Sequence, residues 1–150
     1  MKITALFTTL FFLVPIFVIN TGCRKNIAVP DDATKQLFGA WQWVRTDGGI
    51  NGGFNTPAIA GYDKYIEYTE KGNYTKYQRG NKTESLRFTI SQETSVVSGH
   101  LASIISYRKG GLLNHRNQND FIRHSIEFKL DSLILHEETT DGLKYYYVKK

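Results

Sequence analysis

The side chains that most often carry chemistry in proteins are few in this sequence, and none of them completes a catalytic or metal-binding pattern. The four histidines show neither the His-x-His nor the HExxH spacing of metal sites. Glu137 and Glu138 are neighbours on one expected strand, where successive side chains point to opposite faces, so they do not form an acid–base pair. Ser98-Gly99-His100 lacks the strand–turn–helix context of a nucleophile elbow. The sequence therefore predicts no catalytic residue, no metal site, no cofactor and no enzymatic activity.

Two further segments resemble ligand-binding motifs without completing them. The glycine-rich residues 48–53 lack the Gly-Lys-Ser/Thr ending and the following helix of a phosphate-binding loop. A mixture of basic and aromatic residues, as in single-strand nucleic-acid binders, occurs at Tyr74, Lys76, Tyr77, Arg79 and Lys82. The formal net charge of +5 is well short of a nucleic-acid-binding surface. We attribute these charges to a solvated surface and expect no nucleic-acid partner.

The single cysteine, Cys23, excludes a disulfide framework and lies just after an apolar segment at the start of the chain. Lys2 precedes a mostly apolar segment, residues 3–19, which is interrupted by Pro15. A membrane-spanning helix is the competing interpretation, but this segment is at the short limit for crossing a bilayer, which takes about 20 residues. Residues 1–22 are therefore predicted to be a cleaved signal peptide.

The end of this segment resembles the lipobox of bacterial lipoproteins. Thr21-Gly22-Cys23 matches it, whereas Asn20 stands where Leu, Val or Ile is usual. The resemblance implies that Cys23 is lipidated and becomes the first residue of the mature protein. Because Arg24 rather than Asp follows, it also implies sorting to the outer membrane. We thus expect a bacterial envelope protein that is bound to the membrane through a lipid on Cys23.

Residues 23–36 would be the lipidated tether of this protein. A short helix over residues 33–38, with Asp32 as its N-cap, and an ordinary linker fit this stretch equally well.

Residues 37–150 are expected to form one all-β domain. From Gly39 onward, apolar and polar residues alternate, aromatic residues are dense, and turn residues recur at regular intervals. Eight antiparallel strands in succession favour closure into an up-and-down barrel, because closure removes the edge strands. The expected strands are residues 41–46, 62–69, 74–79, 83–92, 100–107, 121–129, 132–139 and 143–149.

The last two hairpins can be assigned a register. Asp141-Gly142 is a strong two-residue turn signal, which would pair Glu137 with Tyr146 and Leu135 with Val148. A turn at residues 130–133 would pair Phe128 with Leu135. One face then carries His124, Glu137 and Tyr146 above an apolar cluster, while His136 points outward. His124 would either orient a ligand or form a satisfied polar pair with its neighbours, and the pair is favoured.

The domain resembles the lipocalin-like lipoproteins of bacteria. The residues that carry the resemblance are 37–41, 48–53 with Pro57, Glu67-Tyr68, Gly72-Asn73-Tyr74, 131–135 and 141–147. Gly39-x-Trp41 matches the lipocalin element whose tryptophan packs across the closed end of the barrel. In lipocalins a basic residue of the last strand often stacks on that ring, and here Lys149 or Lys150 takes the place of the usual arginine. The resemblance implies a calycin-type barrel with a long first loop over the mouth, and it implies no activity.

Taken together, these features predict a membrane-anchored binding module for a small apolar or amphipathic ligand. Its interior site is expected to have an apolar floor and a small polar set above it. The alternative is a filled barrel that acts through its loops on another envelope protein, as an interaction or inhibitor protein. The candidate ligand-binding residues are Tyr68, Tyr74, His124, Glu137 and Tyr146.

Overall fold

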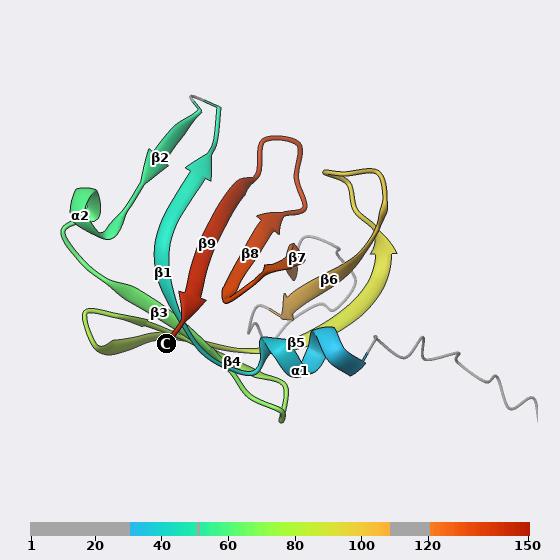
Figure 1. Cartoon of the computed structure of the whole chain (residues 1–150), viewed down its shortest axis with the longest axis horizontal. Helices are drawn as coiled ribbons and strands as arrows, with labels where there is room; N and C mark the ends of the chain where they lie inside the picture. The colour runs from blue at the N-terminus through green and yellow to red at the C-terminus, as the bar shows by residue number, and fades with distance from the viewer. Residues whose placement is uncertain (1–30, 51, 109–120) are drawn as a thin grey trace, which may run out of the picture.

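Antiparallel strands account for most of the described chain, which comprises residues 31–50, 52–108 and 121–150 of a computed structural model (Figure 1). The predicted signal peptide, Cys23 and most of the tether lie outside the described residues. Two short helices accompany the strands: α1 (Asp31–Leu37) and α2 (Pro57–Ala60). The strands are β1 (Gly39–Gly48), β2 (Gly53–Asn55), β3 (Lys64–Tyr68), β4 (Asn73–Gln78), β5 (Asn81–Thr94), β6 (Leu101–Arg108), β7 (Phe121–Lys129), β8 (Ser132–Glu137) and β9 (Leu143–Lys149).

The sheet closes on itself. Each strand pairs antiparallel with its neighbour in the order β2-β1-β3-β4-β5-β6-β7-β8-β9, and β1 also pairs with β9. Strands β1 and β3–β9 thus form a closed up-and-down barrel, which confirms the predicted eight-stranded antiparallel fold. Closure leaves only the short strand β2 outside the ring.

The described part of the glycine-rich segment is a hairpin rather than the expected loop over the mouth. The first residues of β1 pair with β3, and its last residues, Thr46–Gly48, pair with β2 instead. Because β2 takes the place that β3 has left, it prolongs the barrel wall beside β1 (Figure 1). The one-turn helix α2 follows, capped by the hydroxyl of Thr56 and ended by Gly61 at a φ of 71°.

One end of the barrel is closed by the start of the domain. Leu37, the last residue of α1, is fully buried, and Trp41 Nε1 donates a hydrogen bond of 2.7 Å to its carbonyl oxygen. The Trp41 ring packs on Phe128 with ring centroids 6.1 Å apart. Of the two alternatives for residues 33–38, the helix is confirmed, although it begins at Asp31, so Asp32 is not its N-cap.

Lys149 covers the outside of this closed end. Its Nζ lies 4.2 Å from the centroid of the Trp41 ring and donates to the carbonyl oxygen of Phe38 at 2.6 Å. Gly39 has a φ of 113°, and a Cβ there would meet Lys149 Nζ at 3.1 Å, so the position needs glycine. Of the two C-terminal lysines that could take the place of the usual arginine, Lys149 is therefore the one that stacks on Trp41.

The predicted register of the last two hairpins is wrong. Leu135 pairs with Tyr145 rather than Val148, and Phe128 pairs with Leu133 rather than Leu135. In the β7–β8 hairpin, Lys129 pairs with Ser132, so the turn comprises only Leu130-Asp131. In the β8–β9 hairpin, Asp141-Gly142 is only part of a wider turn between Glu137 and Leu143. The Thr139 N–H donates to the Glu137 carbonyl at 2.9 Å, and the Leu143 N–H donates to the Glu137 carboxylate at 3.0 Å.

Correcting this register moves one candidate site residue to the other face of the sheet. Tyr145 and Tyr147 point into the barrel, and Tyr146, between them, points outward. Its ring lies 4.6 Å from the guanidinium carbon of Arg45 on the outer surface. Tyr146 is therefore not an interior residue.

The tip of the β5–β6 hairpin folds over the outer face of β7 and β8. Ser95 Oγ and the Val96 N–H donate to the two carboxylate oxygens of Glu138 at 2.8 and 2.6 Å. Ile104 and Ile134 are buried outside the main core cluster. Glu138 thus has a structural role, and it points away from Glu137 as the strand geometry predicts.

Candidate ligand cavity in the barrel

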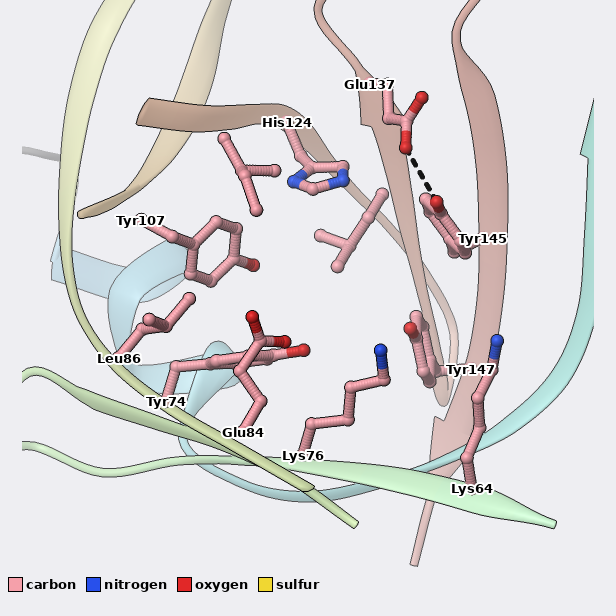
Figure 2. A pocket seen from close by; sticks show the side chains of 12 residues that line it. Lys64, Tyr74, Lys76, Glu84, Leu86, Tyr107, His124, Glu137, Tyr145 and Tyr147 are labelled. Atoms are coloured by element: carbon pink, nitrogen blue, oxygen red, sulfur yellow. Dashed lines mark hydrogen bonds between the residues drawn. The ribbon is translucent and has the colours of Figure 1, made fainter. Parts of the chain in front are cut away.

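A cavity of about 160 Å³ lies inside the barrel, in the half away from Trp41 (Figure 2). Every barrel strand except β1 contributes to its wall. The lining residues are Lys64, Tyr74, Lys76, Glu84, Leu86, Tyr107, Ile122, His124, Leu135, Glu137, Tyr145 and Tyr147. Lys64 begins β3, Glu137 ends β8, and Glu84 lies near the start of β5, so these charged residues gather at the mouth.

Tyrosine rings form the floor of the cavity. The hydroxyls of Tyr68 and Tyr107 share a hydrogen bond, and the Tyr74 ring packs against both rings with centroids 5.4 and 4.8 Å away. Burial raises the pKa of Tyr68 and of Tyr107 well above the usual range, so both stay neutral. The candidate residue Tyr74 lines the cavity as predicted, whereas Tyr68 lies buried beneath it.

His124 is a buried polar residue in the wall of the cavity. Its side chain lies edge-on between the rings of Tyr107 and Tyr145, with centroids 5.5 and 5.7 Å away. Only 8% of the residue is exposed, and its Nδ1 atom has no hydrogen-bond partner among the described residues. Burial lowers the pKa of His124 to about 4, so the imidazole is neutral near pH 7.

Glu137 faces the cavity but does not satisfy His124. The two residues are direct partners on β7 and β8. The Glu137 carboxylate nevertheless accepts hydrogen bonds from the Tyr145 hydroxyl at 2.6 Å and from the Leu143 N–H at 3.0 Å (Figure 2). The predicted satisfied polar pair is therefore wrong, because β9 engages both carboxylate oxygens of Glu137 and the imidazole of His124 is left without a partner among the described residues.

Two lysines at the mouth were not among the predicted site residues. Lys64 Nζ lies 3.8 Å from the centroid of the Trp43 ring, and burial, followed by the nearby charge of Lys76, lowers its pKa to about 8. The sequence predicts that Lys76 is a solvated surface residue, but Figure 2 shows its side chain extending into the cavity. The alternation Lys64-x-Ile66-x-Tyr68 carries the signal that was missed, since it places Lys64 on the face of two buried core residues.

The arrangement is chemically a donor-rich pocket over an aromatic floor. Ammonium groups and tyrosine hydroxyls surround apolar side chains, a combination that is typical of pockets for small molecules with a polar and an apolar part. Within the described residues, no three His, Cys, Asp or Glu side chains are placed to hold a metal ion, and no helix is long and apolar enough to cross a membrane. Comparisons with protein-family models, curated proteins and solved structures find no match to this chain.

Proposed function

We propose that this protein is a membrane-anchored, lipocalin-like module that binds a small amphipathic ligand inside its barrel. The observation that carries the proposal is the cavity of about 160 Å³, whose wall combines tyrosine rings with the side chains of Lys64, Lys76 and a neutral His124. A cavity of about this volume holds one benzene-sized ring.

The proposal includes attachment to a bacterial membrane through a lipid on Cys23, supported by the lipobox resemblance of Thr21-Gly22-Cys23. Helix α1 enters the barrel at the closed end, opposite the mouth. A chain from Cys23 to Asp31 reaches at most about 28 Å. The anchor would therefore keep the closed end toward the bilayer and leave the mouth open to the surrounding compartment. Mass spectrometry of membrane-extracted protein tests this: a lipidated Cys23 at the N-terminus is expected, and an unmodified Cys23 contradicts it.

The proposal assigns no catalytic step to the cavity. His124 and Glu137 are the pair best suited to acid–base chemistry, yet they share no hydrogen bond. The neutral imidazole and the engaged carboxylate suit the binding and orientation of a ligand better than proton transfer.

A second candidate function, contact with another envelope protein, is favoured by the apolar tip of the β5–β6 hairpin. Val96, Val97 and Leu101 expose 66%, 50% and 74% of their surface there. Exposed apolar residues that cluster in this way are typical of protein–protein contacts. In this function the barrel would be a scaffold for the loops, and its interior would bind no ligand.

Filling the cavity distinguishes the two functions. Ile122→Trp places a large side chain at the mouth, and Tyr146→Trp places the same residue on the outer face as a matched control. Phenol binding to the full protein in lipid nanodiscs would be measured by ligand-observed NMR, with empty nanodiscs as the blank. We expect Ile122→Trp to weaken phenol binding at least tenfold and Tyr146→Trp to change it less than twofold. Phenol binding that survives Ile122→Trp unchanged contradicts an interior site and favours the loop-mediated function.

A further inference from the structure

We infer that the ligand is a small organic carboxylate with a flat apolar body, whose acid group is held by Lys64 and Lys76 at the mouth of the cavity. This inference rests on the proposed function and specifies the chemistry of the same site.

The two lysines are placed by strand geometry to act together. Lys76 pairs with Ile66, two residues after Lys64 on the same face of β3. The two side chains are therefore diagonal neighbours on the inner face of adjacent strands, which puts both within reach of one small group. Figure 2 shows both chains rising from the β3–β4 side of the cavity toward Tyr145 and Tyr147.

Neither ammonium group has an anionic partner within the described residues. Lys64 makes only aromatic contacts, at 3.8 Å from the ring centroid of Trp43 and 5.7 Å from that of Tyr145. No salt bridge or hydrogen bond joins the Lys76 ammonium to a described residue, although Glu84 is the direct partner of Lys76 across the strands. Two partly buried ammonium groups without partners are costly, and a bound anion removes that cost through charge-assisted hydrogen bonds.

The carboxylates of the cavity do not supply an anionic partner for both lysines. Both oxygens of Glu137 are occupied by Tyr145 and by the backbone of Leu143. In Figure 2, Glu84 lies beside Tyr74 on the far side of Lys76 from Lys64. Glu84 can therefore neutralise Lys76 but not Lys64, so one further negative charge is needed to neutralise both lysines. This favours a monoanion over a neutral or cationic ligand.

The body of the ligand follows from the rest of the lining. The rings of Tyr107, Tyr145 and Tyr147 and the side chains of Leu86 and Leu135 offer apolar contacts around a space of about 160 Å³. That volume suits one aromatic ring and excludes a long acyl chain.

Benzoate and benzamide test the inference because they share a ring and nearly the same shape but differ in charge. Binding of each to the full protein in phosphatidylcholine nanodiscs would be measured by calorimetry or ligand-observed NMR at pH 6.5 and low salt. We expect benzoate to bind at least tenfold more tightly than benzamide. Lys64→Met and Lys76→Met should each weaken benzoate binding at least fivefold and leave benzamide binding within twofold, whereas Lys82→Met, which removes an exposed lysine near the start of β5, should change neither.

The possible outcomes separate the inference from the proposed function. Equal binding of benzoate and benzamide overturns the inference and leaves the binding function standing, whereas binding of neither overturns both. A benzoate preference that survives both lysine variants overturns the assignment to Lys64 and Lys76. Lys64→Gln, which keeps a polar side chain under Trp43, replaces Lys64→Met if circular dichroism shows that the latter does not fold.

Discussion

The two ends of the barrel use similar residues in different ways. At the closed end, Trp41 Nε1 bonds to Leu37 and Lys149 bonds to Phe38, so the polar atoms that cover the core have partners. In the mouth half, His124 Nδ1 and the Lys64 ammonium lack hydrogen-bond partners among the described residues. A buried polar group with a partner stabilises a fold, whereas one without a partner costs stability. The difference indicates that the closed end contributes more to stability than the mouth half, which is the half that the proposed function assigns to the ligand.

Among the variants that test this comparison, Trp41→Ala is expected to have the largest effect on the free energy of unfolding. Removal of a buried tryptophan costs about 3–5 kcal/mol because it leaves a cavity and loses its contacts with Leu37 and Phe128. Urea unfolding of the protein, followed by far-ultraviolet circular dichroism, would measure the loss. Leu130→Ala, at a fully exposed position of the β7–β8 turn, is the control and should change stability by less than about 0.5 kcal/mol. A comparable loss in both variants would mean that Trp41 has no special place in the closed end.

The second prediction concerns His124 and the stability of the mouth half in acid. The pKa of His124 is about 4 in the folded protein and 6.5 when unperturbed. The unfolded chain therefore binds more protons between these values, and stability present above pH 6.5 is lost as the pH falls toward 4. The expected loss from this residue is about 3 kcal/mol at most, at 1.36 kcal/mol for each pKa unit.

His124→Phe isolates this contribution, since phenylalanine has similar bulk and does not titrate. The difference in unfolding free energy between wild type and His124→Phe should change by about 2–3 kcal/mol between pH 7 and pH 4, in favour of the variant in acid. Parallel pH profiles for the two proteins would show that His124 titrates normally and is not desolvated.

The architecture could be predicted from the sequence because its signals are local. Alternation in 121–129 and the turn residues between strands mark the strands, and eight of them in succession favour closure. Gly39 and Trp41 were placed at the closed end by resemblance, and the hydrogen bond to Leu37 agrees with that place. These features can be predicted without knowing which side chains far apart in the sequence come into contact.

The site was less predictable because it depends on the exact register. Asp141-Gly142 suggests a two-residue turn, but the Glu137 carboxylate bonds to the Leu143 N–H and holds a wider one. The wider turn changes the register of β9, which places Tyr146 on the outer face and Tyr145 inside the barrel. Lys76 was missed for a different reason: its neighbours in sequence are polar, and only its position two residues from Tyr74 shows that it points inward.

The third prediction tests the boundary between the two halves, where the hydroxyls of Tyr68 and Tyr107 bond to each other. Tyr68→Phe leaves the Tyr107 hydroxyl buried without that partner, which should cost about 1–2 kcal/mol. Tyr68→Phe combined with Tyr107→Phe removes both polar groups and should recover much of the loss. Urea unfolding of the two single variants and the double variant gives the coupling energy. Strictly additive losses would contradict a mutual hydrogen bond.

The smallest effect is expected at Lys149, on the outside of the closed end. Its ammonium lies 4.2 Å from the centroid of the Trp41 ring and bonds to the Phe38 carbonyl, but the side chain is largely exposed. An exposed cation–π contact contributes about 0.5–1 kcal/mol, so Lys149→Met should destabilise the protein by roughly that amount. Lys149→Arg should retain the contact or improve it, because a planar guanidinium stacks on an aromatic ring better than an ammonium does. Equal stability of the Met and Arg variants in urea would show that only the aliphatic part of the side chain covers Trp41. In that case the closed end, unlike the mouth, would gain nothing from the positive charge of its lysine.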